Sequence, residues 1–167
     1  MQVTPARVVQ ERDWVRDRAD VVVPLVNDIR ERLADQFAVP VDPISEAQYV
    51  AAVDELFADG DRAVNVAAMV AILRDLDVEG DYPGFVVDEV LGRELAATIA
   101  GTQPLRLLGE ATFHYADIMT HGDDGDAAGA DDLDAALAAG FQEVIPGWEW
   151  TERESPFSVP PRGEDEP

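Results

Sequence analysis

Apolar residues recur in this chain at the spacing of an α-helix, and this periodicity constrains the fold more than any other feature. Leu91, Leu95 and Ile99 form one such stripe, in a segment that is too long for a typical strand. Ser45 and Gln48 have the spacing of a capping box, which marks the start of a helix. A chain of 167 residues is long enough for one domain with a substantial core. The sequence therefore predicts an all-α, single-domain helical bundle of about five or six helices.

Two features of the helix pattern bear on the packing of the bundle. Pro24 either kinks one long N-terminal helix or lies in the first turn of a second helix capped by Asp20. The segment 62–76 is apolar on nearly all sides, so we expect it in the middle of the fold. The last helix is short and is expected to end at Gly140. Helices are expected over residues 5–20 and 20–37, which form either one kinked helix or two, and over 46–59, 62–76, 85–101, 103–121 and 132–140.

The composition changes near residue 150. Residues 1–150 hold the helical pattern and are expected to form the single domain, which ends in an irregular aromatic arm. Residues 151–167 are rich in acidic residues and proline, and such a segment buries too little apolar surface to fold alone. We therefore expect a largely disordered tail.

The charge of the chain is extreme. Its 35 acidic residues face only 12 basic ones, all of them arginine, for a formal net charge of −23. The hydrophobic fraction is 47%, which is that of a folded protein. This acidic, lysine-free composition resembles that of cytosolic proteins from extreme halophiles. In molar salt the self-repulsion of the carboxylates is screened. We therefore expect a cytoplasmic protein whose surface holds hydrated K⁺ and Na⁺ ions without specific sites.

Several classes of function are disfavoured by the residue inventory. The chain has no cysteine and no lysine, and no phosphate loop, dinucleotide motif or serine-hydrolase motif occurs in it. Because no stretch is long and apolar enough to cross a bilayer, no membrane association is expected. A basic helix or aromatic platform for nucleic acid is also missing. We assign no catalytic residue and expect no bound organic cofactor.

Both histidines of the chain fall in the helix expected over 103–121. At 100° per residue, Glu110, His114, Asp117 and His121 share one narrow stripe. Imidazole and carboxylate groups suit a divalent transition metal, but Glu110 and His121 lie about 16 Å apart along the helix axis, too far to share one ion. A metal site would therefore need carboxylates from another helix. The alternative is a solvent-exposed face with local pairs, among them Arg106 with Glu110, and we favour it.

Two other segments are candidates for binding a protein partner. Residues 1–32 carry six arginines and six acids, so the whole net charge lies in the rest of the chain. Arg12 and Arg16 in this neutral region suit an acidic surface on a partner or a second copy, although local ion pairing is the favoured interpretation. Trp148 and Trp150 in the aromatic arm are typical of interface anchors, unless they pack back onto their own helices, which is more common.

From the sequence we favour a non-enzymatic helical protein that acts in protein–protein interaction or regulation in the cytosol of a halophile. We expect it to bind a protein partner or to form a homodimer through its neutral first helices. The alternative hypothesis is a metal-dependent enzyme or metal sensor that uses the histidine stripe of the helix 103–121.

Overall fold

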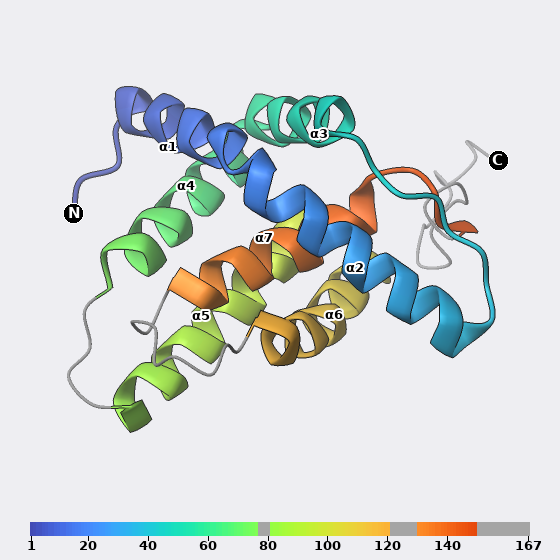
Figure 1. Ribbon diagram of the computed structural model, residues 1–167. Coiled ribbons are helices and arrows are strands. Elements are labelled where there is room, and N and C mark those ends of the chain that lie inside the picture. The colour runs from blue at the N-terminus through green and yellow to red at the C-terminus, as the bar shows by residue number, and fades with distance from the viewer. Residues whose placement is uncertain (77–80, 121–129, 150–167) are drawn as a thin grey trace, which may run out of the picture.

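Seven α-helices make up the described part of the chain, and no strand occurs there (Figure 1). The computed structural model describes residues 1–76, 81–120 and 130–149. The predicted all-α single domain is confirmed. One helix more than expected is present because the first segment divides at Arg18. The helices are α1 (Pro5–Asp17), α2 (Ala19–Phe37), α3 (Glu46–Ala58), α4 (Gly60–Asp75), α5 (Asp81–Ala100), α6 (Leu105–Thr120) and α7 (Ala130–Val144).

Helix α7 packs against α2, α3, α4, α5 and α6. Helices α5 and α6 pack against each other and against α7, whereas α1, α3 and α4 form a second group. Helix α2 packs on α7 from another side, so that α7 runs through the centre of the molecule (Figure 1). Each helix can therefore bury its apolar stripe against at least one neighbour.

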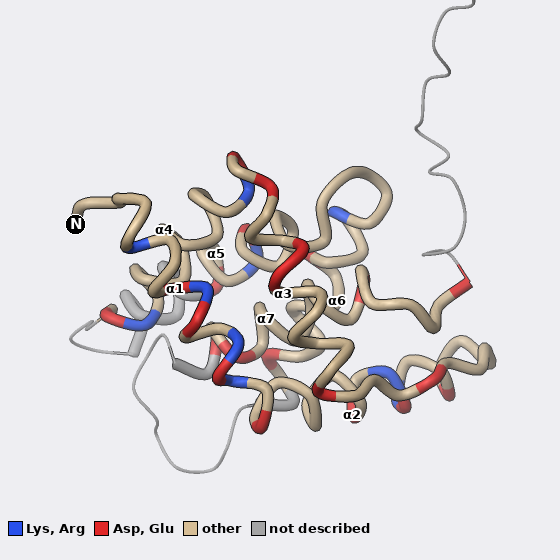
Figure 2. Tube along the Cα trace, turned by 90° about the horizontal axis from the view of Figure 1, so that it is seen from above, with Lys and Arg blue, Asp and Glu red and all other residues tan. Residues whose placement is uncertain are grey.

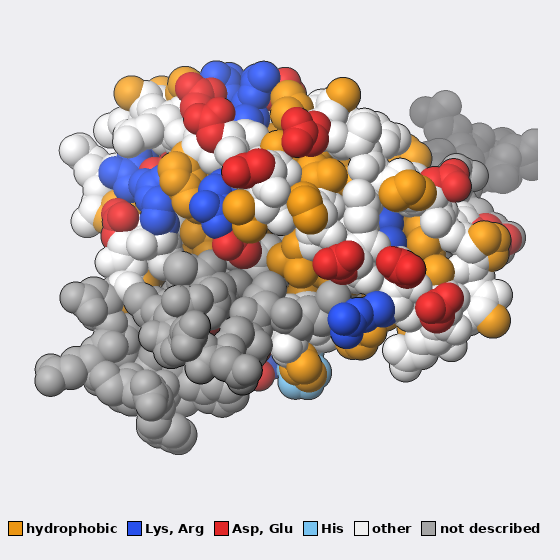
Figure 3. Space-filling model, viewed as in Figure 1, with side chains coloured by type: hydrophobic (Ala, Val, Ile, Leu, Met, Phe, Trp, Pro, Cys, Tyr) orange, Lys and Arg blue, Asp and Glu red, His pale blue; other side chains and the backbone are white. Residues whose placement is uncertain are grey.

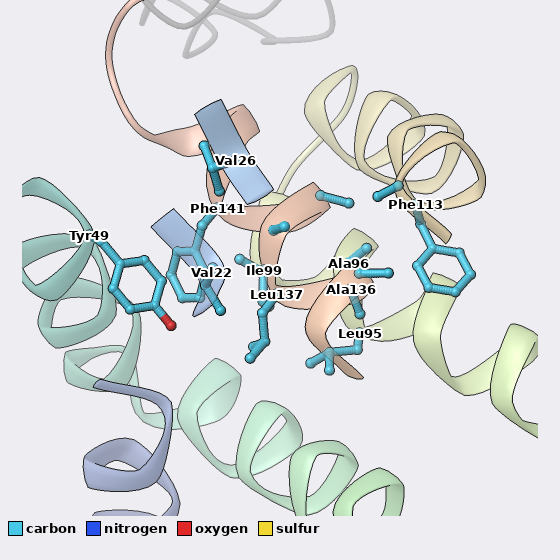
Figure 4. Close-up of a cluster of buried hydrophobic side chains, with 14 of the residues drawn as sticks. Val22, Val26, Tyr49, Leu95, Ala96, Ile99, Phe113, Ala136, Leu137 and Phe141 are labelled. Carbon is cyan, nitrogen blue, oxygen red and sulfur yellow. The ribbon is translucent and has the colours of Figure 1, made fainter. Parts of the chain in front are cut away.

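The core is centred on α7 and not on α4, so the prediction for residues 62–76 is wrong in this respect. Residues 135–139 of α7 are all buried, whereas Val64 and Ile72 of α4 are 46% and 37% exposed. The physical reason is size: the alanines of α7 let several helices approach its backbone closely. Figure 4 shows core side chains of α2, α3, α5 and α6 around α7, where the rings of Tyr49 and Phe141 meet edge to face at 5.2 Å.

Gly140 lies inside α7, and the prediction that the helix ends there is wrong. The helix continues to Val144. The role of this glycine is to allow close contact with α5, not to terminate the helix. A Cβ atom at position 140 would lie 2.6 Å from the Cβ of Ile99 and 3.0 Å from the carbonyl oxygen of Ala96. Only glycine fits between the two helices at this backbone separation.

Neither interpretation of Pro24 describes the N-terminal helices. Pro24 is the sixth residue of α2, beyond the first turn, and the chain breaks earlier, at Arg18. Arg18 is the cap residue of α2 and makes no side-chain capping hydrogen bond, so Asp20 is not the cap. By contrast, the capping box of Ser45 and Gln48 at the start of α3 is confirmed, with both reciprocal hydrogen bonds present.

On the faces that Figures 2 and 3 show, acidic residues of the described part of the chain lie singly or in small groups. Figure 2 shows arginine and acidic residues alternating along α1, and Figure 3 shows acidic side chains separated by hydrophobic and arginine side chains. Such spacing limits direct repulsion between neighbouring carboxylates. The expected tail, residues 151–167, lies outside the described residues.

Candidate functional site

The histidine stripe of α6 is divided by the packing of that helix. His114 is exposed and Glu110 is half-buried, whereas Asp117 is only 8% exposed. His121 lies outside the described residues. Among residues 1–76, 81–120 and 130–149, no three histidine or carboxylate side chains gather where they could hold a metal ion. The metal site therefore stays a prediction that depends on residues not described.

Arg106 does not form the expected pair with Glu110. Its Nη2 atom instead donates a hydrogen bond to Glu94 of α5, and the two side chains form an ion pair. Arg106 lies on the side of α6 that faces α5, so a carboxylate of that helix is within reach. The ion pair therefore ties α6 to α5.

The side of α6 that faces away from the core carries four residues at intervals of four, three and four. We call Leu107, Ala111, His114 and Ile118 the α6 outer stripe. All four are exposed, and the two large apolar residues, Leu107 and Ile118, are 55% and 62% exposed. The opposite side of the same helix holds buried Phe113. Helix α6 thus presents apolar side chains both to the core and to the surroundings.

The two arginines proposed for partner binding are engaged within the chain. Arg12 donates two hydrogen bonds to the carboxylate of Asp13, at 3.0 and 2.9 Å. Arg16 joins α1 to α3 through Asp54, at 2.8 Å. Local ion pairing therefore describes Arg12, whereas Arg16 pairs with a carboxylate of another helix.

Trp148 is completely buried, so its ring does not face a partner in this structure. Its Nε1 atom donates a hydrogen bond of 2.6 Å to Oε1 of Gln142, and the guanidinium of Arg30 lies 5.9 Å from the ring centroid. Packing onto its own helices is thus the interpretation that describes Trp148. Trp150 lies outside the described residues.

Arg30 of α2, which is only 1% exposed, closes the C-terminal end of α7. Its Nη2 atom donates to the carbonyls of Gln142 and Ile145 at 2.9 and 2.5 Å, and its Nη1 atom donates to those of Asp42 and Pro146 at 2.9 and 3.0 Å. The last carbonyls of a helix have no partner within it, and a cation also stabilises the negative end of the helix dipole.

The side chain of Arg30 is removed from solvent by burial. Burial lowers the pKa of Arg30 to about 10, while the nearby carboxylates of Glu143 and Asp42 act in the opposite direction. Sequence reasoning missed this residue, although a signal existed. Arg30 lies four residues after Val26 and three before Leu33, at a position of the stripe that faces the core.

A buried carboxylate, that of Glu11, joins α1 to α4. Glu11, which is completely buried, accepts hydrogen bonds from Arg7 at 2.6 Å and from Arg74 at 2.7 and 2.8 Å. The ring centroid of Trp14 lies 5.3 Å from the guanidinium of Arg18 and 5.1 Å from that of Arg74. Hydrogen bonds between a carboxylate and guanidinium groups are charge-assisted and short. These contacts hold the two helices together.

A cavity of about 480 Å³ lies where α3, α4, α5, α6 and α7 meet. Arg62 lines it and donates hydrogen bonds to the carbonyls of Thr98 and Ile99 at 3.3 and 2.5 Å, which caps the end of α5. Glu55 and Asp59 also line it. Its lining combines arginine with carboxylates and threonine hydroxyls and contains no histidine, so the cavity offers polar contacts.

The comparisons with known proteins place the chain in a family without assigning an activity. In the part of the chain that the structure describes, no helix is both long and apolar enough to span a membrane. No curated protein and no solved structure matches the chain. A family model described as "Domain of unknown function (DUF7984)" matches residues 1–161, a range that includes every helix given above. The chain therefore belongs to the DUF7984 family.

Proposed function

We propose that this protein is a non-enzymatic helical protein of a halophile cytosol that acts by binding another protein or a second copy of itself. The observation that supports this best is the α6 outer stripe. It contains no carboxylate, in a chain in which 35 of 167 residues are acidic. Its two largest side chains are also more than half exposed.

The energetics of the stripe favour an interaction surface. Fully burying a leucine or isoleucine side chain gives about 1.5–3 kcal/mol, so Leu107 and Ile118 retain a substantial part of this free energy for a partner. The stripe is also held in place, because Phe113 anchors the opposite face of α6 in the core and Arg106 ties the helix to Glu94. A preorganised surface loses little conformational entropy on binding.

The proposed surface differs from the first helices that the charge distribution suggested. Arg12 and Arg16 already bind carboxylates of their own chain, so a partner would have to compete with these contacts. A partner of the α6 outer stripe would only have to displace water from its side chains. We therefore assign the interaction to α6.

The test compares two variants in molar potassium chloride by light scattering and by capture of partners from a halophile lysate. Leu107→Ser/Ile118→Ser removes the apolar surface without adding charge. Val9→Ser is the matched control, because Val9 is 47% exposed on α1. The wild type and the control should associate with themselves or a partner, and the double variant should not. A strictly monomeric wild type that captures no protein would refute the proposal.

The halophile assignment has its own test. Screening acts over about 3 Å at 1 M salt and about 30 Å at 0.01 M, so dilution restores repulsion among the charges that give the net −23. We expect the melting temperature, followed by circular dichroism, to fall steadily as potassium chloride is lowered. A chain that stays fully folded without added salt would contradict the assignment.

A further inference from the structure

We infer that the partner of the α6 outer stripe is a second copy of this chain, related by a two-fold axis that pairs the two α6 helices in antiparallel orientation. This inference rests on the proposed function, because it names the partner of the same surface. Three properties of the stripe support it: the symmetry of its spacing, its lack of acidic residues and the position of Glu110.

The spacing of the stripe reads the same in both directions. Leu107, Ala111, His114 and Ile118 are separated by four, three and four residues, as in the seam of paired helices. A two-fold axis between residues 112 and 113 places Leu107 opposite the partner's Ile118 and Ala111 opposite the partner's His114. Large apolar side chains then meet at both ends, and the small Ala111 permits close approach in the middle. A surface that is complementary to itself is what a two-fold dimer requires.

Electrostatics limits where two copies can meet. Each chain carries a net charge of −23, so an interface between copies must lie where carboxylates are few. The α6 outer stripe satisfies this condition. Helix α6 has two carboxylates: Glu110, which is half-buried, and Asp117, which is only 8% exposed.

The carboxylate of Glu110 distinguishes the two possible orientations. In the antiparallel pair, Glu110 comes beside the partner's His114. The carboxylate can accept a hydrogen bond from the imidazole N–H, and the two-fold symmetry forms this contact twice. In a parallel pair in register, Glu110 would instead lie opposite the partner's Glu110, where like charges repel. Charge complementarity therefore favours the antiparallel dimer.

The size of the contact predicts a reversible dimer. Helix α6 has 16 residues and is about 24 Å long. Because one helix from each copy forms the contact, the interface falls at or below the lower end of the range of about 1,200–2,000 Å² for stable complexes. We expect a monomer–dimer equilibrium that depends on protein concentration.

Disulfide cross-linking tests the orientation directly, because the full chain has no cysteine of its own. Leu107→Cys and Ile118→Cys are prepared as separate variants, oxidised alone or as a mixture in molar potassium chloride, and analysed by non-reducing gel and mass spectrometry. In the antiparallel dimer the mixture should form the mixed disulfide. Each variant alone should not, because identical positions then lie eleven residues, or about 16 Å, apart, beyond the reach of a disulfide. Val9→Cys on exposed α1 is the control and should cross-link with neither variant.

Each outcome separates this inference from the proposed function. Efficient cross-linking of Leu107→Cys with itself would overturn the antiparallel arrangement. A wild type that sediments as a monomer at all concentrations would overturn self-association. If that monomer still captures a protein, and Leu107→Ser/Ile118→Ser does not, the second-copy inference fails while the proposed function stands. If it captures nothing, both fail.

Discussion

Replacing Arg30 by methionine gives the sharpest test of how the centre of this fold is held. Methionine keeps a long apolar stem but removes the guanidinium that donates to four carbonyls. Two of these hydrogen bonds, to Gln142 and Ile145, are buried, so water cannot replace them without rearrangement. Each buried acceptor left without a donor costs about 1–3 kcal/mol. We therefore expect Arg30→Met to lower the free energy of unfolding by about 4 kcal/mol.

The assay is thermal unfolding in molar potassium chloride, followed by circular dichroism. In a domain of this length 1 kcal/mol corresponds to about 2–4 °C, so the melting temperature should fall by about 8–16 °C. Arg32→Met is the matched control, because Arg32 is an exposed arginine on the same helix. Arg30→Lys should lie between the two, since an ammonium keeps the charge but cannot span four carbonyls.

The comparison with the control decides the result. If Arg30→Met melts within about 2–4 °C of Arg32→Met, the difference is below about 1 kcal/mol. The closing of α7 by Arg30 would then contribute little to stability, and the reasoning from buried carbonyls would be refuted.

Three further predictions concern other parts of the chain. Gly140→Ala should destabilise the fold by about 1–3 kcal/mol through overpacking against α5. Gly60→Ala is the control and should not destabilise it, because a Cβ atom at position 60 would meet no atom within 4 Å. Thermal melts of the two variants test the difference. Burial raises the pKa of Tyr49 above the ordinary tyrosine pKa of 10.0. At a pH above 10.0 the native state therefore keeps a proton that the unfolded chain loses. Stability should therefore fall as the pH rises past about 10, and the decline should be smaller in Tyr49→Phe; unfolding measured at several alkaline pH values checks the sign, and equal declines would contradict it. Finally, elemental analysis of protein purified without chelator tests the metal hypothesis: a stoichiometric transition metal that is lost from His114→Ala/His121→Ala would support it, and metal-free wild-type protein would rule it out.

The helical architecture was largely predictable because helix formation depends on neighbours in the sequence. The capping box of Ser45 and Gln48 specified the start of α3, and the periodic spacing of Leu91, Leu95 and Ile99 specified α5. Gly140 shows where such local reasoning failed. Its small size serves a contact with a helix about forty residues away along the chain, and no local pattern records that contact.

The candidate site was less predictable, for a related reason. The helical wheel grouped Asp117 with His114 on one face of α6, but the structure buries Asp117 and turns Ile118 outward. A carboxylate so near the core and an isoleucine so exposed both run against the usual preferences of these residues. The neighbours of α6, chiefly α5 and α7, determine which side of the helix is covered.

By itself, the sequence determined where the helices form, which chemistries the chain lacks and how acidic its surface is, because caps, periodicity and charge are local or additive properties. The tertiary structure alone decided that α7 is central, that Arg30 closes its end and that the outer side of α6 carries the apolar stripe. These features depend on contacts between residues far apart in the chain. Burial is a property of the packed neighbours and not of the residue type.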